Sequence, residues 1–305
     1  MSDGCANILP EKNRSHFWNT LLAYLEVTKP VSVLLLVFTA ITTMTVASAT
    51  HGTVSTQQLL VAVGAVTLAC AGSNAVSCYV DRDLDASMVR TRKRPIPQGR
   101  ISPPERALYW GLLLFALSLV LAWTLNPLAF FCLWGGMLGY VGVYSLWLKR
   151  RSSWNIILGG FSGGLPALFG WAAITGSVSQ LPLAIAALVV LWIPNHIWSL
   201  AIFYREDYAK VKVPMLPVAS EIGKALHCLL STVVLMVICS LFIYFLGPWG
   251  QVYLYTALLT GLGALAISTW VYLYPTPKNA WLLFKFSSPY LFLLFLSMMV
   301  DVLSV

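Results

Sequence analysis

The chain has 305 residues, of which 58% are hydrophobic and only 10% are charged, and its formal net charge is +8. Its mean hydropathy of +0.78 is too high for a protein of this size with a water-facing surface. The composition therefore excludes a soluble globular protein and predicts an integral membrane protein. It gives no reason to expect a nucleic-acid partner, because the basic residues lie between long apolar segments and orient them.

Long apolar segments follow one another along nearly the whole chain. A helix needs about 20 residues to cross the hydrocarbon core, and nine segments meet that length. We therefore expect an all-α, polytopic membrane protein with one domain over 1–305. The predicted spans lie near 31–49, 57–79, 107–124, 127–147, 155–175, 181–203, 226–246, 251–274 and 281–303.

The Lys and Arg residues predict the orientation of these spans. All 19 fall on the side that holds the N-terminus. Since basic residues concentrate on the cytoplasmic side, we expect residues 1–30 to form a cytoplasmic N-terminal segment. That segment lacks a cleavable signal pattern, so the expected location is a bacterial inner membrane. The basic segments are 1–30, 80–106, 148–154, 204–225 and 275–285.

The densest group of charges is the stretch NAVSCYVDRDLDASMVRTRKRPIPQGR, residues 74–100, at the cytoplasmic end of the second predicted span. In a continuing helix, Asn74, Asp81 and Asp85 share one face, with Ser77 beside it. The two carboxylates repel each other, and the repulsion grows near lipid. A positive charge is therefore expected between them.

Two interpretations of that positive charge remain open. Arg82 and the Arg residues after it would neutralise an ordinary wet helix end, a common arrangement at membrane interfaces. Alternatively, Asp81 and Asp85 hold Mg²⁺, a hard cation that takes few protein carboxylates and bridges to substrate phosphate. In that case the downstream Arg and Lys side chains would bind a diphosphate.

The stretch CYVDRDLDASMVRTRKRPIPQGRI resembles the first signature of the UbiA superfamily of intramembrane prenyltransferases, and in particular its protohaem IX farnesyltransferase (haem O synthase) group. The usual pattern of that group is N-x-x-x-D-x-x-x-D followed by M-x-R-T-x-x-R-P. Ser77 takes the place of the Asn, and Asn74, one turn earlier, is an alternative. The matching residues are Asp81, Asp85, Met88, Arg90, Thr91, Arg94 and Pro95.

Two further stretches are similar to the same group. Residues 144–173 carry a basic pair at one helix end and a Gly-rich next helix. Residues 191–218, LWIPNHIWSLAIFYREDYAKVKVPMLPV, contain its W-x-P-x-H-x-W block and V-P-M-L-P run. Many relatives have a second D-x-x-x-D here. This chain has Phe203 and Asp207 in the corresponding places, with Tyr204 as a further candidate.

The resemblance implies transfer of the farnesyl group of farnesyl diphosphate to the 2-vinyl group of haem B (protohaem IX). Water adds in the same reaction, which makes haem O for terminal oxidases. Mg²⁺ is the implied cofactor, held by Asp81 and Asp85, and the lipid bilayer surrounds the chain. A haem A synthase or a terminal oxidase is a candidate protein partner. The implied diphosphate-binding residues are Arg90, Arg94, Lys149, Arg150 and Asp207.

His196 lies within the sixth predicted span, two residues after Pro194, which frees a backbone carbonyl. A lone histidine in a helix bundle is often a hydrogen-bonded structural residue, yet polar groups at membrane depth are functional candidates. Because His196 occupies the histidine position of the family, we expect it to contact haem or handle protons. It joins Asp81 and Asp85 as the third implied catalytic residue.

Two other functions remain as alternatives. Prenylation of 4-hydroxybenzoate or another quinone precursor would keep the same Asp pair, although the W-x-P-x-H-x-W block argues against it. The other alternative is a haem or lipid carrier, or an oxidase assembly factor. Carriers tend to place their polar residues near the midplane of the membrane, whereas this chain gathers its carboxylates and cations at one face.

Overall fold

The computed structural model describes residues 11–52 and 54–304, with side chains from residue 18 onward, so Lys12 and Arg14 lie outside the described side chains. Within this part of the chain, nine helical segments are long and apolar enough to span a membrane. Each agrees with a predicted span to within four residues, which confirms the all-α, nine-span prediction. They are Pro30–His51, Thr56–Val80, Glu105–Leu125, Pro127–Leu148, Asn155–Thr175, Gln180–Phe203, Ile222–Tyr244, Gln251–Leu273 and Pro277–Ser304.

Seven of these spans are single helices, namely α2, α3, α5, α9, α12, α13 and α14 in chain order. The other two change helix type along their length. The fourth span is α6 (Pro127–Met137) continued by a π-helix, η1 (Leu138–Leu148). The fifth consists of α7 (Asn155–Gly160), a short 3₁₀ turn and α8 (Leu165–Thr175). Shorter helices are α1 (Glu11–Val27), α4 (Arg82–Ser87), α10 (Arg205–Lys210) and α11 (Leu216–Ala219).

Helix boundaries follow local signals in the sequence. The Ser55 hydroxyl accepts a hydrogen bond from the backbone N–H of Gln58 and caps α3. The Asn126 side chain caps α6 in the same way, and Pro127 fills the first helical position, where no N–H is needed. Helix α8 ends at Gly176, whose φ of 64° lies in the left-handed region that glycine adopts without strain.

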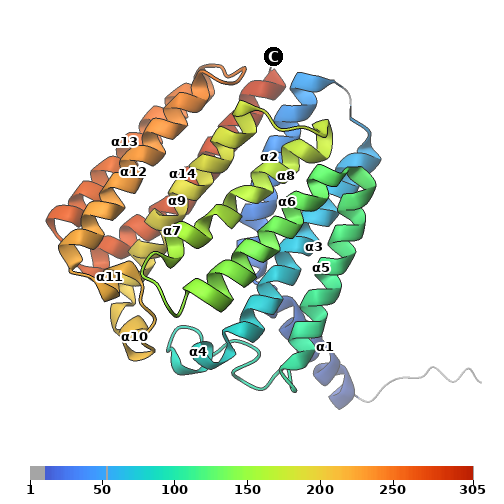
Figure 1. Ribbon diagram of the computed structural model, residues 1–305, viewed down its shortest axis with the longest axis vertical. Helices are drawn as coiled ribbons and strands as arrows, with labels where there is room; N and C mark the ends of the chain where they lie inside the picture. The colour runs from blue at the N-terminus through green and yellow to red at the C-terminus, as the bar shows by residue number, and fades with distance from the viewer. Residues whose placement is uncertain (1–10, 53, 305) are drawn as a thin grey trace, which may run out of the picture.

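The spans pack into one bundle with two large apolar clusters (Figure 1). One cluster lies among α2, α3, α5, α6 and α8, and the other among α8, α9, α12, α13 and α14. The short helices α1, α4, α10 and α11 lie at the lower end of the bundle in Figure 1, and the C-terminus lies at the upper end. The connections that were predicted to carry the basic residues are therefore gathered at one end.

Helices α3 and α5 make the most extensive pairing of the bundle because two glycines face each other. A Cβ on Gly72 would lie 2.6 Å from the carbonyl oxygen of Gly111, and a Cβ on Gly111 would lie 2.8 Å from that of Gly72. Small residues allow such a close approach, which supplies the packing energy between helices in lipid. This pairing holds the lower end of α3, where the charged stretch begins.

We expect Gly72→Ala to lower the free energy of unfolding by about 2 kcal/mol, because α3 and α5 must separate to admit the methyl group. Reversible denaturation in mixed micelles measures the change. Gly136→Ala in α6 is the matched control, since no atom outside the neighbouring backbone of its own helix lies within 4 Å of its added Cβ. Equal stability of the two variants would show that this close approach contributes nothing.

Candidate active site

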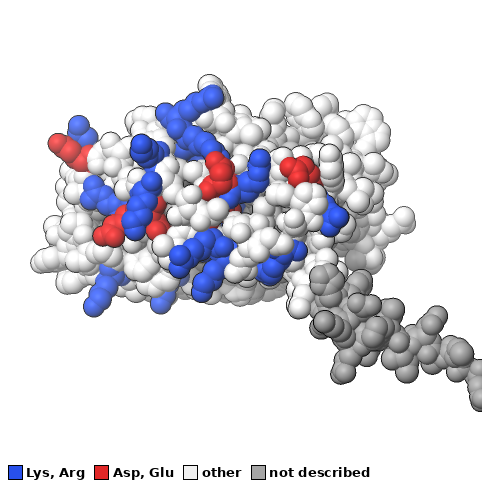
Figure 2. Space-filling view, turned by 90° about the horizontal axis from the view of Figure 1, so that it is seen from below, with Lys and Arg blue, Asp and Glu red and all other residues white. Residues whose placement is uncertain are grey.

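The described Lys and Arg side chains collect on the lower end of the bundle, which Figure 2 shows face-on with the acidic side chains among them. They come from the connections after α3, η1, α9 and α13 and from the segment before α2. The sequence places these connections on one side by alternation of spans, and the structure brings them together in space. Within this face, two buried carboxylates and their partners form the candidate site.

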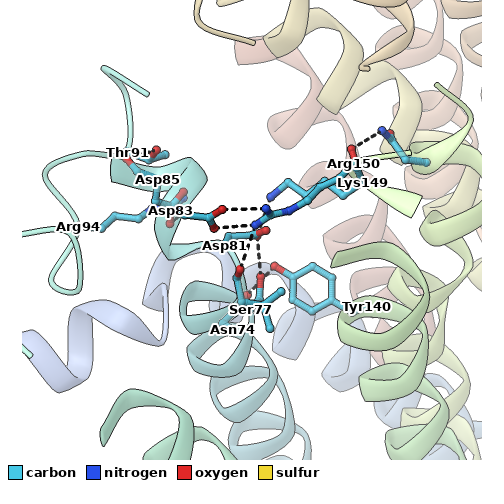
Figure 3. A network of polar contacts seen from close by, with 12 residues as sticks. Asn74, Ser77, Asp81, Asp83, Asp85, Thr91, Arg94, Tyr140, Lys149 and Arg150 are labelled. Atoms are coloured by element: carbon cyan, nitrogen blue, oxygen red, sulfur yellow. Dashed lines mark hydrogen bonds and ion pairs between the residues drawn. The ribbon is translucent and has the colours of Figure 1, made fainter. Parts of the chain in front are cut away.

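Asp81 follows the last residue of α3, and its backbone N–H donates to the carbonyl of Ser77. Its side chain is 4% exposed, and one carboxylate oxygen, Oδ2, lies 2.6 Å from Nζ of Lys149 (Figure 3). The hydroxyl of Ser77 lies 3.5 Å from the same oxygen. Among the described residues, no group donates a hydrogen bond to the other oxygen, Oδ1, although it is buried. Asp81 therefore keeps one acceptor for an outside ligand.

Asp85 lies one helical turn further along, in α4, and is also buried. Its Oδ2 lies 2.6 Å from the guanidinium of Arg94, and its backbone carbonyl accepts a hydrogen bond from the hydroxyl of Thr91. These contacts fold the loop after α4 back onto the carboxylate. Burial alone lowers the pKa of Arg94, but the charge of Asp85 offsets that effect and raises the pKa above its ordinary value.

The two carboxylates are thus neutralised by Lys149 and Arg94. Arg94 is one of the downstream Arg residues that the first interpretation named, whereas Arg82 pairs with neither carboxylate. Arg82 instead donates to the backbone carbonyl of Tyr79 and covers the ring of that residue. The loop position predicted for Lys149 is confirmed, because η1 ends at Leu148.

Asp83 and Arg150 form a separate pair on the outer surface of the site. Both terminal nitrogens of Arg150 bind the carboxylate of Asp83, at 2.8 and 2.6 Å. The Asp83 side chain is 60% exposed, and the hydrogen bond from Arg150 lowers its pKa. Asp83 is therefore exposed, whereas Asp81 and Asp85 on either side of it in the sequence are buried. Arg150, a predicted diphosphate ligand, is engaged by Asp83 and not by the buried carboxylates.

The second charged stretch, after α9, meets the loop that follows α4. The backbone N–H of Arg90 donates to Oδ2 of Asp207 at 3.3 Å, and its guanidinium lies over the ring of Tyr204, 5.7 Å from the centroid. Nε of Arg90 is buried and has no hydrogen-bond partner in the described part of the chain. A groove of about 520 Å³ opens beside these residues, lined in part by Val89, Phe203, Tyr204, Asp207 and Lys210.

Two residues of the site were not anticipated from the sequence, Lys29 and Tyr140. Nζ of Lys29, just before α2, donates to the hydroxyl of Tyr140 at 3.3 Å, and that hydroxyl donates to Oδ1 of Asn74, also at 3.3 Å. Lys29 has a φ of 55°, which turns the chain sharply into Pro30. Lys29 could have been found from the Lys-Pro pair at the start of the first span, because that pair places a cation at the basic end of the bundle.

Tyr140 lies on η1, the π-helix that also carries Tyr144. The two rings stack with centroids 6.1 Å apart, and Nζ of Lys149 lies 5.8 Å from the Tyr144 centroid. A Cβ on Gly159 would lie 2.6 Å from Cβ of Tyr144, so this glycine lets α7 pack closely against η1. π-Helical segments are rare and are often found at functional sites.

His196 lies deeper in the bundle, on α9. Its ring is stacked between Trp192 and Phe284, and its Nδ1 lies 2.7 Å from the hydroxyl of Ser287 on α14. Within the described part of the chain, His196 forms no hydrogen bond or ion pair with the Asp81 or Asp85 carboxylates. Along α9, His196 is eight residues before Tyr204, which at 1.5 Å per residue is about 12 Å further into the membrane.

The family model described as "UbiA prenyltransferase family" matches residues 35–296, most of the chain. The chain belongs to the UbiA prenyltransferase family. A relative from Desulforudis audaxviator, "Protoheme IX farnesyltransferase", is 69% identical over 289 residues, which are 95% of this chain and 91% of that protein. The resemblance seen in the charged motifs is thus confirmed over nearly the whole length.

Solved structures of UbiA-type proteins show the same fold. A digeranylgeranylglyceryl phosphate synthase superposes with a TM-score of 0.77 at 22% identity, covering 94% of this chain and 99% of its own. A UbiA homolog from Archaeoglobus fulgidus, solved with GPP and Mg²⁺, has a TM-score of 0.67 at 20% identity, covering 93% and 100%. These likenesses establish the bundle architecture of the family for this chain.

The residues present fit a divalent metal ion of the kind that binds with substrate. Asp81 offers a buried oxygen without a partner, and Asp85 lies one turn away. In the described part of the chain, no three His, Cys, Asp or Glu residues stand close enough together to hold a metal ion by themselves. A metal here would therefore take its remaining ligands from water and a diphosphate, as Mg²⁺ commonly does.

Proposed function

We propose that this chain transfers the farnesyl group of farnesyl diphosphate to the 2-vinyl group of haem B, with addition of water, and so makes haem O. The relative with 69% identity, which is named protoheme IX farnesyltransferase, supports the proposal. The structural observation that best supports the proposal is the pair of buried carboxylates, each paired with a cation, at the basic end of the helix bundle. This arrangement suits an amphiphile whose head is a diphosphate.

In this reaction the bond between farnesyl C1 and the diphosphate oxygen breaks, a carbon–carbon bond forms to the vinyl group, water adds to the resulting porphyrin-side cation and a proton leaves. Mg²⁺, held by Asp81 and Asp85, would neutralise the charge that develops on the leaving diphosphate. Lys149 and Arg94 stand at the same carboxylates and would exchange part of their contact with Asp for contact with phosphate oxygens.

Other side chains of the basic face would position the two substrates. Arg90, whose Nε has no partner among the described residues, and Arg150 would bind the outer phosphate, with Asp207 anchoring the Arg90 loop. Asn74, Ser77 and Tyr204 line the same region and are further candidates for contact.

His196, deeper in the bundle, would meet the porphyrin, and lipid together with the helix packing would keep bulk water from the farnesyl cation. Polar side chains are costly at this depth, which supports a functional role.

We further propose that the basic face lies in the cytoplasm and that the protein resides in a bacterial inner membrane. The gathering of Lys and Arg at one end of the bundle supports this orientation. A haem A synthase or a terminal oxidase would then take over the product. One domain over 1–305 remains a prediction.

A mass-resolved haem profile tests the function. Membranes that contain the protein are incubated with haem B, farnesyl diphosphate and Mg²⁺, with and without a chelator. A haem heavier by one farnesyl group plus water, absent with the chelator, is expected. Prenylation of 4-hydroxybenzoate in its place would assign the chain to quinone synthesis, and no product with either acceptor would favour a carrier.

We expect Arg94→Ala to raise the farnesyl diphosphate concentration needed for half-maximal rate by about tenfold, because a hydrogen bond to a charged group contributes about 1.5 kcal/mol or more. Arg92→Ala is a control from the same loop. It is exposed, and it forms no ion pair with any residue whose side chain is described. An unchanged requirement in Arg94→Ala would remove this residue from the diphosphate site.

A further inference from the structure

The ring of His196 has only one open edge. Its faces are covered by Trp192 and Phe284, with centroids 4.5 Å away in both cases and interplanar angles of 20° and 32°. Its Nδ1 lies 2.7 Å from Oγ of Ser287. His196 is nevertheless only partly buried. Nε2 has no hydrogen-bond partner among the described residues and is not one of the fully buried polar atoms, so the edge that carries it is accessible.

The contacts of Ser287 fix which ring nitrogen carries the proton. Its Oγ lies 2.7 Å from Nδ1 of His196 and also 2.7 Å from the backbone carbonyl of Phe284. A carbonyl cannot donate, so the single hydroxyl hydrogen points to Phe284. The hydroxyl oxygen then accepts from His196. Nδ1 is the protonated nitrogen, and Nε2 carries the free lone pair.

Ser287 is itself held in place. It is fully buried in α14, and its carbonyl accepts a hydrogen bond of 2.7 Å from Nε1 of Trp192. Trp192 and His196 are neighbours on one face of α9, because they are four residues apart. Two hydrogen bonds and two stacked rings thus lock the imidazole between α9 and α14. The imidazole is therefore held firmly in place, although its Nε2 edge has no protein partner in the described part of the chain.

We propose that Nε2 of His196 is an axial ligand to the iron of the haem B substrate and that Ser287 is the positioning residue that keeps this nitrogen unprotonated. The proposal rests on the proposed function. Histidines that bind metals are neutral and donate their other ring N–H to an acceptor that fixes the tautomer and strengthens the ligand. Ser287, backed by the Phe284 carbonyl, is such an acceptor.

Iron ligation would also explain why the polar side chain of His196 lies so far inside the membrane. Nε2 would hold the porphyrin about 12 Å along α9 from Tyr204, while the diphosphate stays at the basic face. A single contact to the central iron fixes the distance of the ring from the helices. The protein can thereby present one edge of the porphyrin, with its vinyl group, toward the Asp81 side of the bundle.

The test compares haem B with iron-free protoporphyrin IX, titrated into the full chain in lipid nanodiscs. Wild type is expected to bind ferric haem B with the absorption and electron paramagnetic resonance signature of a nitrogen ligand. His196→Ala should lose that signature, and Ser287→Ala should weaken haem B binding about tenfold, the cost of losing a partner of a metal ligand. Ser287→Thr, which keeps the hydroxyl, should restore binding to within about twofold.

Binding of iron-free protoporphyrin should be the same in all these variants, because it has no metal to ligate. His227→Ala is the matched histidine control, since this ring lies near the basic face against Tyr272. Equal loss of affinity for both porphyrins in Ser287→Ala, or a wild-type haem complex without a nitrogen ligand, overturns the inference.

The proposed function is judged separately in the same samples. Haem O formation without the spectroscopic signature of a nitrogen ligand would contradict only the proposed iron ligation. Failure of the wild-type protein to bind or convert haem B would contradict the proposed farnesyl transfer to haem B as well.

Discussion

Asp81→Asn is expected to reduce haem O formation about a thousandfold at saturating substrates. The substitution keeps the shape of the side chain but removes the charge that Lys149 faces at 2.6 Å and that the proposed Mg²⁺ would bind. Losing one preorganised electrostatic contact to a developing anion typically costs 100- to 1,000-fold in rate, and the proposed metal site would lose a ligand with it. The initial rate of haem O formation, followed by mass, measures the effect.

Asp83→Asn is the matched control for this variant. It makes the same chemical change two residues away, but the Asp83 side chain is 60% exposed and pairs with Arg150 on the outside. Exposed ion pairs contribute little to stability, so we expect at least half of the wild-type rate. If both variants lost activity alike, the charged stretch would act only through its total charge.

A double variant separates catalysis from folding at Asp81. Removing one partner of a buried ion pair leaves the other charge unpaired, which is destabilising in itself. Asp81→Asn combined with Lys149→Gln removes both charges, so the fold should recover while the activity stays low. Recovery of activity in the double variant would mean that Asp81 serves only to neutralise Lys149.

The spans could be predicted from the sequence because a membrane imposes a simple rule. Each helix must present about 20 apolar residues, and the connections must carry the charges, so counting along the chain locates every span. The short helices α1, α4, α10 and α11 escaped that rule. They lie in polar connections, where helix formation depends on contacts such as the Arg94–Asp85 pair and not on hydropathy.

The sequence supplied candidate site residues but not the pairings that the structure shows between them. The Asp-x-x-x-Asp spacing and the family resemblance pointed to Asp81, Asp85 and His196. They could not show that Lys149 would select Asp81 and Arg150 would select Asp83, because such choices depend on how η1 ends beside α3. Lys29 lies about 50 residues from Asp81 in the sequence, and only the folded bundle brings it to Tyr140.

The pairing of His196 with Ser287 was equally hidden. The two residues are separated by 91 positions, and serine is too common in membrane helices for a single one to stand out. Their contact follows from the packing of α14 on α9. Sequence patterns predict which segments form helices and which helix faces hold functional side chains. The partner of each polar group depends on the register between the packed helices.

Asp301 is a buried carboxylate far from the basic face, near the C-terminal end of α14, and its removal should cost the most stability. It is 3% exposed, and its Oδ2 accepts hydrogen bonds from the backbone N–H groups of Gly250 and Tyr253, at 2.9 and 2.8 Å. Those groups belong to the start of α13, where helical N–H groups have no partner within the helix. A negative charge there also favours the helix dipole.

We expect Asp301→Ala to lower the free energy of unfolding by about 4 kcal/mol, because two hydrogen bonds to a charged acceptor are lost and two buried donors remain. Asp301→Asn keeps an acceptor oxygen without the charge and should lose about half as much. Reversible denaturation in mixed micelles gives both values. Since α13 begins at the end of the bundle opposite the basic face (Figure 1), the folded fraction should keep the wild-type requirement for farnesyl diphosphate. A wild-type unfolding energy in Asp301→Ala would mean that water or lipid headgroups satisfy the start of α13 equally well.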